Sequence, residues 1–551
     1  MMAAQAKNRT GSLAAVILAA ALLYLVLAVP NHPLALAWDG LLVVPLEWPV
    51  IIIGLAVLGP KRRFTHVLKW VIVVFLTLVT VIKLVDFATF STYNRGFNPL
   101  VDLHLIPAAW NLGSGSLGLA LASLIVLALI AAIAGLVWAL WWATGTFVRV
   151  ALPLGARRAA AVAVIACAGL AAAEIGNAMR AWSLPFGPPG AAFTTRVAVE
   201  RVDMISETYV RLRNFRIAAE TDPFAQAAPL LDKVGGRDVV LIYVESYGGS
   251  SLTNPRYAPT HLASLAGIEA ELDAQGLAMR SGWLEAPILG GQSWMSHATL
   301  AKGLWIPDQR TYGAALVSGR RSLFHLAQDN GFETVAVMPA ITMDWPEADF
   351  MGFDRIYAAA DLGYNGLPFN WVTMPDQFTL TAFDRLVRTP ADGAQRQPIF
   401  AQIALISSHA PWTPVPELVA WDDIGDGTIF DAVAQSGDPP DVVWRDRDRV
   451  RDQFRQAVDY SLRTVGAYAA RSTDNPPLMI VMGDHPPALF VSEDEAMTVP
   501  VHVIGPPDLV ARFADWGWVA GMVPDLASPA IRMDAFRNRF LATFSDGSVS
   551  P

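Results

Sequence analysis

Cysteine is almost absent from this chain of 551 residues. Cys167 is the single cysteine, so an intramolecular disulfide and a zinc site built from cysteines are both excluded. Charged residues are also scarce, at 16% of the sequence, where a soluble domain usually has about 25%. Hydrophobic residues make up 53%, and the mean hydropathy is +0.38. This composition argues against a wholly soluble protein, and the length allows more than one domain.

The few charges are unevenly distributed along the chain. Residues 1–180 hold 12 Lys and Arg against 5 Asp and Glu, a balance of +7. The remaining residues hold 28 against 44, a balance of −16, and the two parts sum to the net charge of −9. This asymmetry predicts a membrane domain at 1–180 followed by a water-facing domain. The acidic surface of the second part argues against a nucleic-acid partner, because binding to phosphates requires a basic surface.

Five apolar stretches reach the length of about 20 residues that is needed to cross a bilayer. They lie near 12–30, 39–59, 67–87, 117–143 and 158–178. The second stretch contains two prolines and Glu47, so a bundle of four spans is the alternative to five.

Basic residues predict the orientation of these spans. Lys and Arg precede the first stretch and lie between the second and third and between the fourth and fifth, whereas the loops at 31–38 and 88–116 contain only Arg95. Since basic loops stay in the cytoplasm, the N-terminus is expected inside and everything after about residue 180 outside. Only an odd number of spans agrees with this pattern.

Two carboxylates, Glu47 and Asp86, fall inside or at the edge of apolar stretches. Intramembrane carboxylates are often functional, although an interfacial position at a helix end is the simpler interpretation. A linker is expected at 181–224. Within it, 194–220 has apolar residues at helical spacing, with Arg201 and three later arginines on the other face. This predicts a helix on an anionic membrane surface or a linker helix packed on the next domain.

The third part, 225–551, alternates short β-rich runs with helical stretches, which predicts an α/β domain with a largely parallel central sheet. The predicted strands are Asp238–Val244, Thr334–Met338, Ile399–Ile406, Leu478–Met482 and Val499–Ile504. Helical patterns fall at 258–275, 322–330, 375–388 and 446–471.

Chemically active side chains follow three of these strands. Glu245 ends the first predicted strand, Ser408-His409 follow the third, and Asp484-His485 follow the fourth. Because sites in open α/β sheets gather at the carboxyl ends of strands, these residues are expected at one edge. Carboxylates with neutral imidazole are ligands for a divalent transition metal such as Zn²⁺ or Mn²⁺.

A glycine-rich turn, Gly290-Gly291-Gln292-Ser293, runs into a predicted helix. Such a turn presents free N–H groups that suit a phosphate or sulfate group. Beside a metal, the hydroxyl of Ser293 could lose its proton and attack phosphorus. Alone, however, Ser293 is better explained as a helix cap.

Together these residues resemble the alkaline phosphatase/sulfatase superfamily, and more narrowly its membrane-anchored phosphoglycerol transferases, which include the lipoteichoic acid synthases and the transferases that modify periplasmic glucans. The resemblance covers the layout of five membrane helices before an external sulfatase-like domain. The motifs that carry it are Val244-Glu245-Ser246, Ser293-x-x-Ser296-x-x-Thr299, Gly352-Phe353-Asp354, Ser408-His409-Ala-Pro and Gly483-Asp484-His485.

The resemblance implies one metal ion, bound by Glu245, Asp484, His485 and the oxygen of Ser293. Mn²⁺ is expected, with Zn²⁺ or Mg²⁺ as alternatives. Ser293 is then the nucleophile, with Ser296 as its rival.

The resemblance also implies three residues that bind the substrate: His409, which contacts the phosphate or assists the leaving group, Gln292 and Trp345. One position departs from the family. Two residues after the tryptophan, lipoteichoic acid synthases have an arginine that holds glycerophosphate, and this chain has Glu347. Contact with a glycerol headgroup is therefore in question.

Two neighbouring branches fit less well. Formylglycine sulfatases need x-Pro-x-Arg after the modified residue, and Ser293 is followed by Trp-Met-Ser-His. The phosphoethanolamine transferases of lipid A usually carry disulfides in a domain that here has no cysteine, although phosphoethanolamine itself stays possible as the transferred group.

The sequence thus predicts transfer of a headgroup phosphate from phosphatidylglycerol or phosphatidylethanolamine to a glycan or lipid through a phosphoserine. A phosphodiesterase or phosphatase of the same superfamily and a non-catalytic membrane sensor or scaffold are the alternatives. The 34 arginines against 6 lysines are typical of a high-GC bacterium. The expected location is the bacterial inner membrane, as a multi-pass protein with its catalytic domain on the periplasmic or extracellular side.

Overall fold

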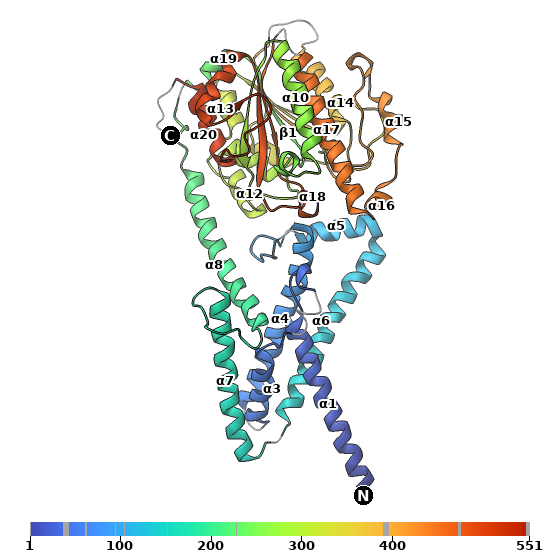
Figure 1. Ribbon diagram of the computed structural model, residues 1–551, viewed down its shortest axis with the longest axis vertical. Coiled ribbons are helices and arrows are strands. Elements are labelled where there is room, and N and C mark those ends of the chain that lie inside the picture. The colour runs from blue at the N-terminus through green and yellow to red at the C-terminus, as the bar shows by residue number, and fades with distance from the viewer. Residues whose placement is uncertain are drawn as a thin grey trace. The chain divides into compact units, whose positions relative to one another are not determined.

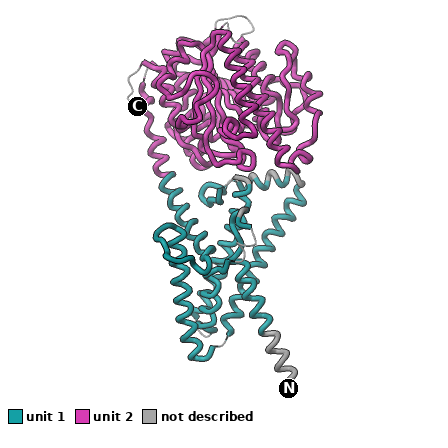
Figure 2. Tube along the Cα trace, in the orientation of Figure 1, with its two compact units in different colours: residues 1–211 teal, residues 212–551 magenta. Residues whose placement is uncertain are grey.

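The computed structural model describes residues 2–36, 43–60, 63–93, 95–103, 105–150, 152–227, 229–389, 396–471 and 475–546. The chain divides into two compact units, Met1–Arg211 and Leu212–Pro551 (Figure 2). Each unit has its own hydrophobic core.

Unit 1 is helical. Its α-helices are α1 (Met2–Ala28), α3 (Glu47–Leu58), α4 (Arg63–Tyr93), α5 (Leu105–Leu117), α6 (Leu119–Val148), α7 (Leu154–Ala178) and α8 (Phe193–Glu220), of which α8 continues into unit 2. Within the described residues, three segments are long and apolar enough to cross a membrane: Arg63–Ser91, Leu119–Val148 and Leu154–Ala178. Two shorter apolar helices lie at Leu13–Ala28 and Glu47–Leu58. The five predicted stretches overlap these five helices. In the second stretch, 39–42 lie outside the described residues, 43–46 are not helical, and α3 has 12 residues, fewer than a membrane span needs.

Two carboxylates of unit 1 that the sequence singled out are buried, and each makes a polar contact. Asp86 lies inside α4 and forms an ion pair with Arg201 of α8 at 2.6 Å. Glu47 is the first residue of α3, and its Oε1 accepts a hydrogen bond from the N–H of Thr195 at 2.8 Å. Arg201, which is expected on the face opposite the apolar residues and towards an anionic membrane surface, is instead 7% exposed and compensates the charge of Asp86.

Unit 2 contains a nine-stranded sheet (Figure 1). Its strands are β1 (Val239–Val244), β2 (Ala278–Glu285), β3 (Glu333–Met338), β4 (Arg355–Ala358), β5 (Ile399–Leu405), β6 (Leu478–Gly483), β7 (Thr498–Gly505), β8 (Val519–Ala520) and β9 (Ile531–Arg532). Their order is β4-β3-β5-β1-β6-β7-β2-β8, with β9 paired to β2. The strands from β4 to β6 are parallel, and β7 is antiparallel to both β6 and β2.

Helices cover both faces of this sheet. Alternate residues of β1 point to opposite faces, as the period of two in a strand requires. Val240, Ile242 and Val244 pack with α10 (Ala258–Ala274), α14 (Asp376–Phe383) and α17 (Arg447–Arg471). On the other face, Leu241 and Tyr243 pack with α11 (Trp294–Lys302), α12 (Gln309–Leu316), α13 (Leu323–Asp329) and α20 (Met533–Phe544). Short helices complete the unit: α9 (Ser250–Thr253), α15 (Asp431–Ala434), α16 (Pro440–Val443), α18 (Leu489–Ser492) and α19 (Pro507–Val510).

The predicted largely parallel α/β sheet is confirmed. The five predicted strands correspond to β1, β3, β5, β6 and β7, and the four helical patterns to α10, α13, α14 with a π-helical extension at Asp384–Arg388, and α17. The sequence did not predict β2, β4, β8 and β9.

Candidate active site

Three adjacent parallel strands, β5, β1 and β6, bring the predicted residues to one edge of the sheet. Val244 at the end of β1 pairs in register with Leu405 of β5 and with Gly483 of β6. The residues that follow therefore leave the sheet side by side. Glu245 and Asp484 are the first residues beyond their strands.

Glu245, Asp484 and His485 form a buried cluster whose ligand atoms all lie within 4.8 Å of one another. Nε2 of His485 is 3.2 Å from Oε1 of Glu245 and 3.9 Å from Oδ1 of Asp484. Nδ1 of His485 lies 2.9 Å from the carbonyl oxygen of Pro486, which fixes the ring by accepting a hydrogen bond from the Nδ1–H. Nε2 is thereby left as the nitrogen that can bind a metal ion.

The electrostatics of this cluster favour binding of a cation. Burial and the negative charge of Glu245 raise the pKa of Asp484 well above its usual value. Burial opposes ionisation of His485, but the charges of Asp484 and Glu245 outweigh it and raise the pKa of His485 to about 9. For Glu245 as well, burial is outweighed, here by the charge of His485, so that its pKa is lowered. Two buried carboxylates and one imidazole nitrogen fit the donor set of a divalent transition metal.

Ser293 stands at the N-cap position of α11, but its side chain does not cap the helix. Its hydroxyl instead donates to Oε2 of Glu245 at 2.9 Å and lies 3.2 Å from Nε2 of His485. Ser296, one turn later, is fully buried, and its hydroxyl has no hydrogen-bond partner among the described residues. The structure thus brings Ser293, and not Ser296, to the carboxylate and the imidazole.

The turn before Ser293 has an unusual backbone. Gly290, Gly291 and Gln292 all have positive φ, at 73°, 127° and 67°. The N–H of Gly290 donates to the carbonyl of Pro486 at 3.0 Å, and a Cβ at Gly290 would lie 3.3 Å from Cα of Ala488. The turn before Ser293 is therefore held against the loop that carries His485. Glycine at position 290 allows this approach because it has no side chain and readily adopts positive φ.

His409 lies near the cluster without joining it. It follows β5, and an electrostatic interaction with it is among the causes that lower the pKa of Glu245. The hydroxyl of Ser408 donates to the backbone carbonyl of Glu245 at 2.7 Å, so the ends of β5 and β1 are tied together.

Asp376, the first residue of α14, holds the loop before His409. Its Oδ1 accepts from the N–H groups of Ile406 and Ser407, both at 2.8 Å, and its Oδ2 accepts from the hydroxyl of Ser461 at 2.6 Å. Asp376 was missed from the sequence because it acts on backbone groups and belongs to no motif.

A family model matches part of unit 2. Residues 305–508 match the family model described as Sulfatase. That range contains His409, Asp484 and His485. Unit 2 is a sulfatase-like domain.

Several solved structures are similar to the sulfatase-like domain at low identity. The lipoteichoic acid synthase LtaP from Listeria monocytogenes has 14% identity and a TM-score of 0.34, over 53% of this chain and 70% of that one. The phosphoglycerol transferase GacH from Streptococcus pyogenes, in complex with sn-glycerol-1-phosphate, has 12% identity and a TM-score of 0.35, over 60% and 90%. The phosphonate monoester hydrolase of Agrobacterium radiobacter has 14% identity and a TM-score of 0.32, over 55% and 77%. No curated protein matches the sequence significantly.

The structure also shows the contacts of Trp345 and Asp354, which belong to two further motifs of the sulfatase-like domain. Trp345 precedes a 3₁₀-helix (Pro346–Phe350), is half-buried, and packs near Phe353 at a ring-centroid distance of 6.3 Å. Asp354 accepts from the N–H and the hydroxyl of Thr334, both at 2.8 Å, at the start of β3. Asp354 therefore secures the strand at the end opposite to the site.

His297 is a further residue close to the cluster in the sulfatase-like domain. It lies one helical turn after Ser293, with its ring 4.0 Å from that of Tyr243 of β1. Nε2 of His297 and the hydroxyl of Tyr243 are buried without hydrogen-bond partners among the described residues. The spacing of four residues from Ser293 was the signal available in the sequence.

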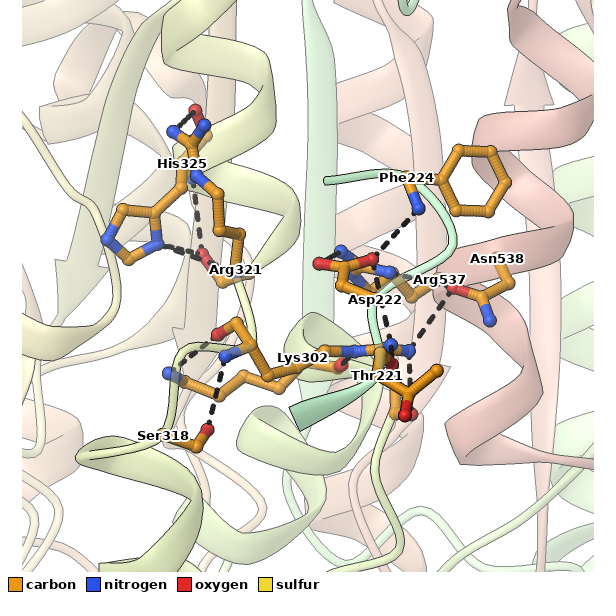
Figure 3. A network of polar contacts seen from close by, with 12 residues as sticks. Thr221, Asp222, Phe224, Lys302, Ser318, Arg321, His325, Arg537 and Asn538 are labelled. Atoms are coloured by element: carbon orange, nitrogen blue, oxygen red, sulfur yellow. Dashed lines mark hydrogen bonds and ion pairs between the residues drawn. The ribbon is translucent and has the colours of Figure 1, made fainter. Parts of the chain in front are cut away.

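The far end of α11 is held by a buried polar network (Figure 3). Lys302, its last residue, is 1% exposed, and its ammonium donates to the carbonyl of Arg320 at 3.3 Å. Burial and the charge of Arg537 lower the pKa of Lys302 to about 8. Arg537 donates to Asp222 at 2.7 Å, and Arg320 donates to the carbonyl of Thr221 at 2.5 Å. The helix that carries Ser293 is thus fixed at both ends.

Proposed function

We propose that this protein transfers a phospholipid headgroup phosphate to a glycan or lipid hydroxyl through a covalent phosphoserine at Ser293. One observation carries the proposal. The hydroxyl of Ser293 leaves its capping position unused and lies between Oε2 of Glu245, at 2.9 Å, and Nε2 of His485, at 3.2 Å. A hydroxyl held by a base and beside a cation site is the arrangement of an activated nucleophile.

The first half of the reaction breaks the bond between phosphorus and the diacylglyceryl oxygen. The hydroxyl of Ser293 gives its proton along the hydrogen bond to Glu245 and attacks phosphorus. The diacylglyceryl oxygen leaves with the electron pair of the broken bond and takes a proton from His409. Diacylglycerol is released, and the headgroup phosphate stays on Ser293.

The second half of the reaction regenerates the free hydroxyl of Ser293. An acceptor hydroxyl gives its proton to His409 and attacks the phosphoserine. The oxygen of Ser293 leaves with the electron pair of the broken bond and takes back the proton from Glu245 as the new phosphodiester forms. Gln292, beside the nucleophile, and Trp345 are assigned to substrate binding in this proposal.

Glu245, Asp484 and His485, with the oxygen of Ser293, would hold one divalent metal ion, for which we propose Mn²⁺. When bound, such an ion supplies positive charge that lowers the pKa of a nearby hydroxyl and neutralises phosphate.

We also propose the membrane arrangement that the sequence predicts. Residues 1–180 cross the bacterial inner membrane five times, 181–224 form a linker, and 225–551 lie on the periplasmic or extracellular side. Three apolar helices that are long enough to cross a membrane support this arrangement. It would hold the site where phosphatidylglycerol or phosphatidylethanolamine is available.

The test uses the full chain in detergent with Mn²⁺ and either lipid carrying a labelled headgroup. We expect an intact-mass increase equal to glycerophosphate or phosphoethanolamine, together with released diacylglycerol. Ser293→Ala should lose the adduct completely, since no other hydroxyl touches the cluster residue Glu245 from α11. Ser296→Ala is the matched control, one turn along the same helix, and should keep it.

Other results would overturn the proposal in different ways. Diacylglycerol release with the headgroup phosphate delivered to water, even when candidate glycans are present, would identify a hydrolase. An adduct that persists in Ser293→Ala would reject the nucleophile. No adduct and no diacylglycerol from either lipid would reject the donor.

A further inference from the structure

Unit 1 contains an apolar groove that the proposed chemistry does not use. Its volume is about 710 Å³, and it lies between α3, α4 and α7. Typical lining residues are Val50, Ile72 and Val164. Glu47 and Thr195 are the two polar residues in its lining.

The groove has the length of one lipid leaflet. It is lined from Glu47 to Leu58, the whole of α3. Twelve residues rise about 18 Å, and half of the hydrocarbon core of a bilayer is about 15 Å thick. Ile165 lines the groove and is nevertheless 72% exposed, so the groove opens sideways. An acyl chain in the surrounding bilayer can therefore enter it without crossing a polar surface.

The polar end of the groove requires a hydrogen-bond donor. Glu47 is 8% exposed, and its Oε1 is occupied by the N–H of Thr195. Its Oε2 is buried without a partner among the described residues. Such an oxygen in apolar surroundings is costly unless a donor reaches it.

The negative charge of Glu47 at this end of the groove favours a neutral glycerolipid over one that carries a phosphate. Lys83 interacts electrostatically with Glu47, but its ammonium already donates to the carbonyl of Leu27 at 3.0 Å and to the hydroxyl of Thr194 at 2.8 Å. A phosphate placed beside Glu47 would be repelled by the carboxylate. A neutral lipid with a free hydroxyl supplies a donor without this repulsion.

We infer that the groove binds diacylglycerol, with the acyl chains along α3, α4 and α7 and the free hydroxyl donating to Oε2 of Glu47. The inference rests on the proposed function, which makes diacylglycerol the first product. The sequence-based orientation puts the basic segment 61–63 in the cytoplasm, so that the Glu47 end lies on the outer side, where the proposed reaction releases this lipid.

The experiment labels the full chain, in lipid nanodiscs, with a diacylglycerol that carries a diazirine in one acyl chain. Labelled peptides should come from α3, α4 and α7. Unlabelled diacylglycerol should compete at least tenfold better than phosphatidylglycerol and than the acetate ester of diacylglycerol, which lacks the hydroxyl.

Variants test each part of the groove. Ala168→Phe fills its middle and should reduce labelling at least fivefold, whereas Val162→Phe, at a position on α7 that is 69% exposed, should leave labelling unchanged. Gly54→Leu is a second filling variant, because a Cβ there meets only Val164, at 4.0 Å, and it should act as Ala168→Phe does. Glu47→Gln keeps an oxygen for the N–H of Thr195 and should abolish the preference for diacylglycerol over its acetate.

If Ala168→Phe and Gly54→Leu are labelled as strongly as Val162→Phe, the inference is overturned. If phosphatidylglycerol competes better than diacylglycerol, the occupant of the groove is the donor lipid and not diacylglycerol. The outcomes separate this inference from the proposed function. Selective labelling without a Ser293 adduct would reject only the function, and an adduct without selective labelling would reject only the groove.

Discussion

At the scale of single residues, the site depends on two carboxylates that are buried side by side. Glu245 and Asp484 are 7% and 1% exposed, and Nε2 of His485 lies 3.2 Å from Oε1 of Glu245 and 3.9 Å from Oδ1 of Asp484. Such a cluster gains stability from a bound cation, because the cation removes the repulsion between the carboxylates. Metal binding should therefore be linked to the stability of the folded state.

The first prediction concerns this linkage. Mn²⁺ at a hundredfold excess over its Kd should stabilise the wild-type protein by about 2.7 kcal/mol, seen as a higher Tm. Glu245→Gln should lower Mn²⁺ affinity by more than about a hundredfold, since even a group that only hydrogen-bonds to a ligand contributes about 10- to 100-fold. Calorimetric titration measures the affinity.

The exposed Glu417 provides the control for this prediction. Glu417→Gln should bind Mn²⁺ as the wild type does. Unchanged affinity in Glu245→Gln would show that the ion does not use this carboxylate.

Residue types at strand ends were the part of the site that the sequence could reveal. Glu245, Asp484 and His485 each follow an apolar run that is recognisable as a buried strand, and Ser293 follows two glycines. Asp376 gave no such signal, because its role is to accept hydrogen bonds from the backbone of a loop 30 residues away.

At the scale of elements, Asp238 joins the three strands that form the site. Its carboxylate is paired with Arg396 at 2.6 Å and accepts from the N–H of Ile399 at the start of β5, at 3.0 Å. Its backbone carbonyl accepts from the N–H of Leu478 at the start of β6, at 2.8 Å. The register of β5, β1 and β6 is thus fixed at the end of the sheet opposite to Glu245.

The contacts of Asp238 make the stability of the sulfatase-like domain depend on pH. Burial would raise the pKa of Asp238, but Arg396, the N–H of Ile399 and Arg388 outweigh burial and lower it. Because the folded-state pKa lies below the unfolded value of about 3.9, the stabilisation is present above that pH and is lost as the pH falls further. Asp238→Asn should lower the free energy of unfolding by about 3 kcal/mol near neutral pH.

Urea unfolding of the full chain from about pH 7 down to about pH 3 checks this prediction. The wild type should lose stability more steeply than Asp238→Asn below about pH 4. Parallel curves for the two proteins would contradict it.

The elements that the sequence did not reveal have a common physical reason. In β2, Arg280, Ser281 and Gly282 interrupt the apolar run, so the local sequence does not look like a buried strand. The strand is held in the core by its pairing with β7, which is distant in the sequence. The antiparallel direction of β7 is set by that pairing and by β6, which no local pattern encodes.

At the scale of the whole molecule, each unit combines a hydrophobic core with buried ion pairs. In unit 1, arginines balance the buried carboxylates of Asp86, Asp102 and Glu174. Arg201 of α8 and Asp86 of α4 form one such pair at 2.6 Å. Sequence periodicity could not show this pair, because it assigned Arg201 to the charged face of its helix.

Arg201→Gln should destabilise unit 1 by about 3 to 5 kcal/mol, because Asp86 is left buried without a compensating charge. Mn²⁺ affinity of the sulfatase-like domain should stay at the wild-type value. Thermal unfolding in detergent and calorimetric titration measure the two effects.

The double variant Asp86→Asn/Arg201→Gln removes both charges and should recover much of the lost stability. A stability of Arg201→Gln equal to that of the wild type would mean that the pair contributes nothing to unit 1.

The order of the strands also determines when the site can first exist. The bond from the N–H of Ser246 to Asp484 joins residues 238 positions apart, and β1 lies in the sheet between β5 and β6, which both come much later in the chain. Proteins are synthesised from the N-terminus, so a growing chain exposes Glu245 and Ser293 long before Asp484 and His485 exist. A ribosome-bound chain that ends before β6 lacks two of the three residues of the cluster. If the proposed function holds, the nascent protein therefore gains its activity towards lipid only when its synthesis is nearly complete.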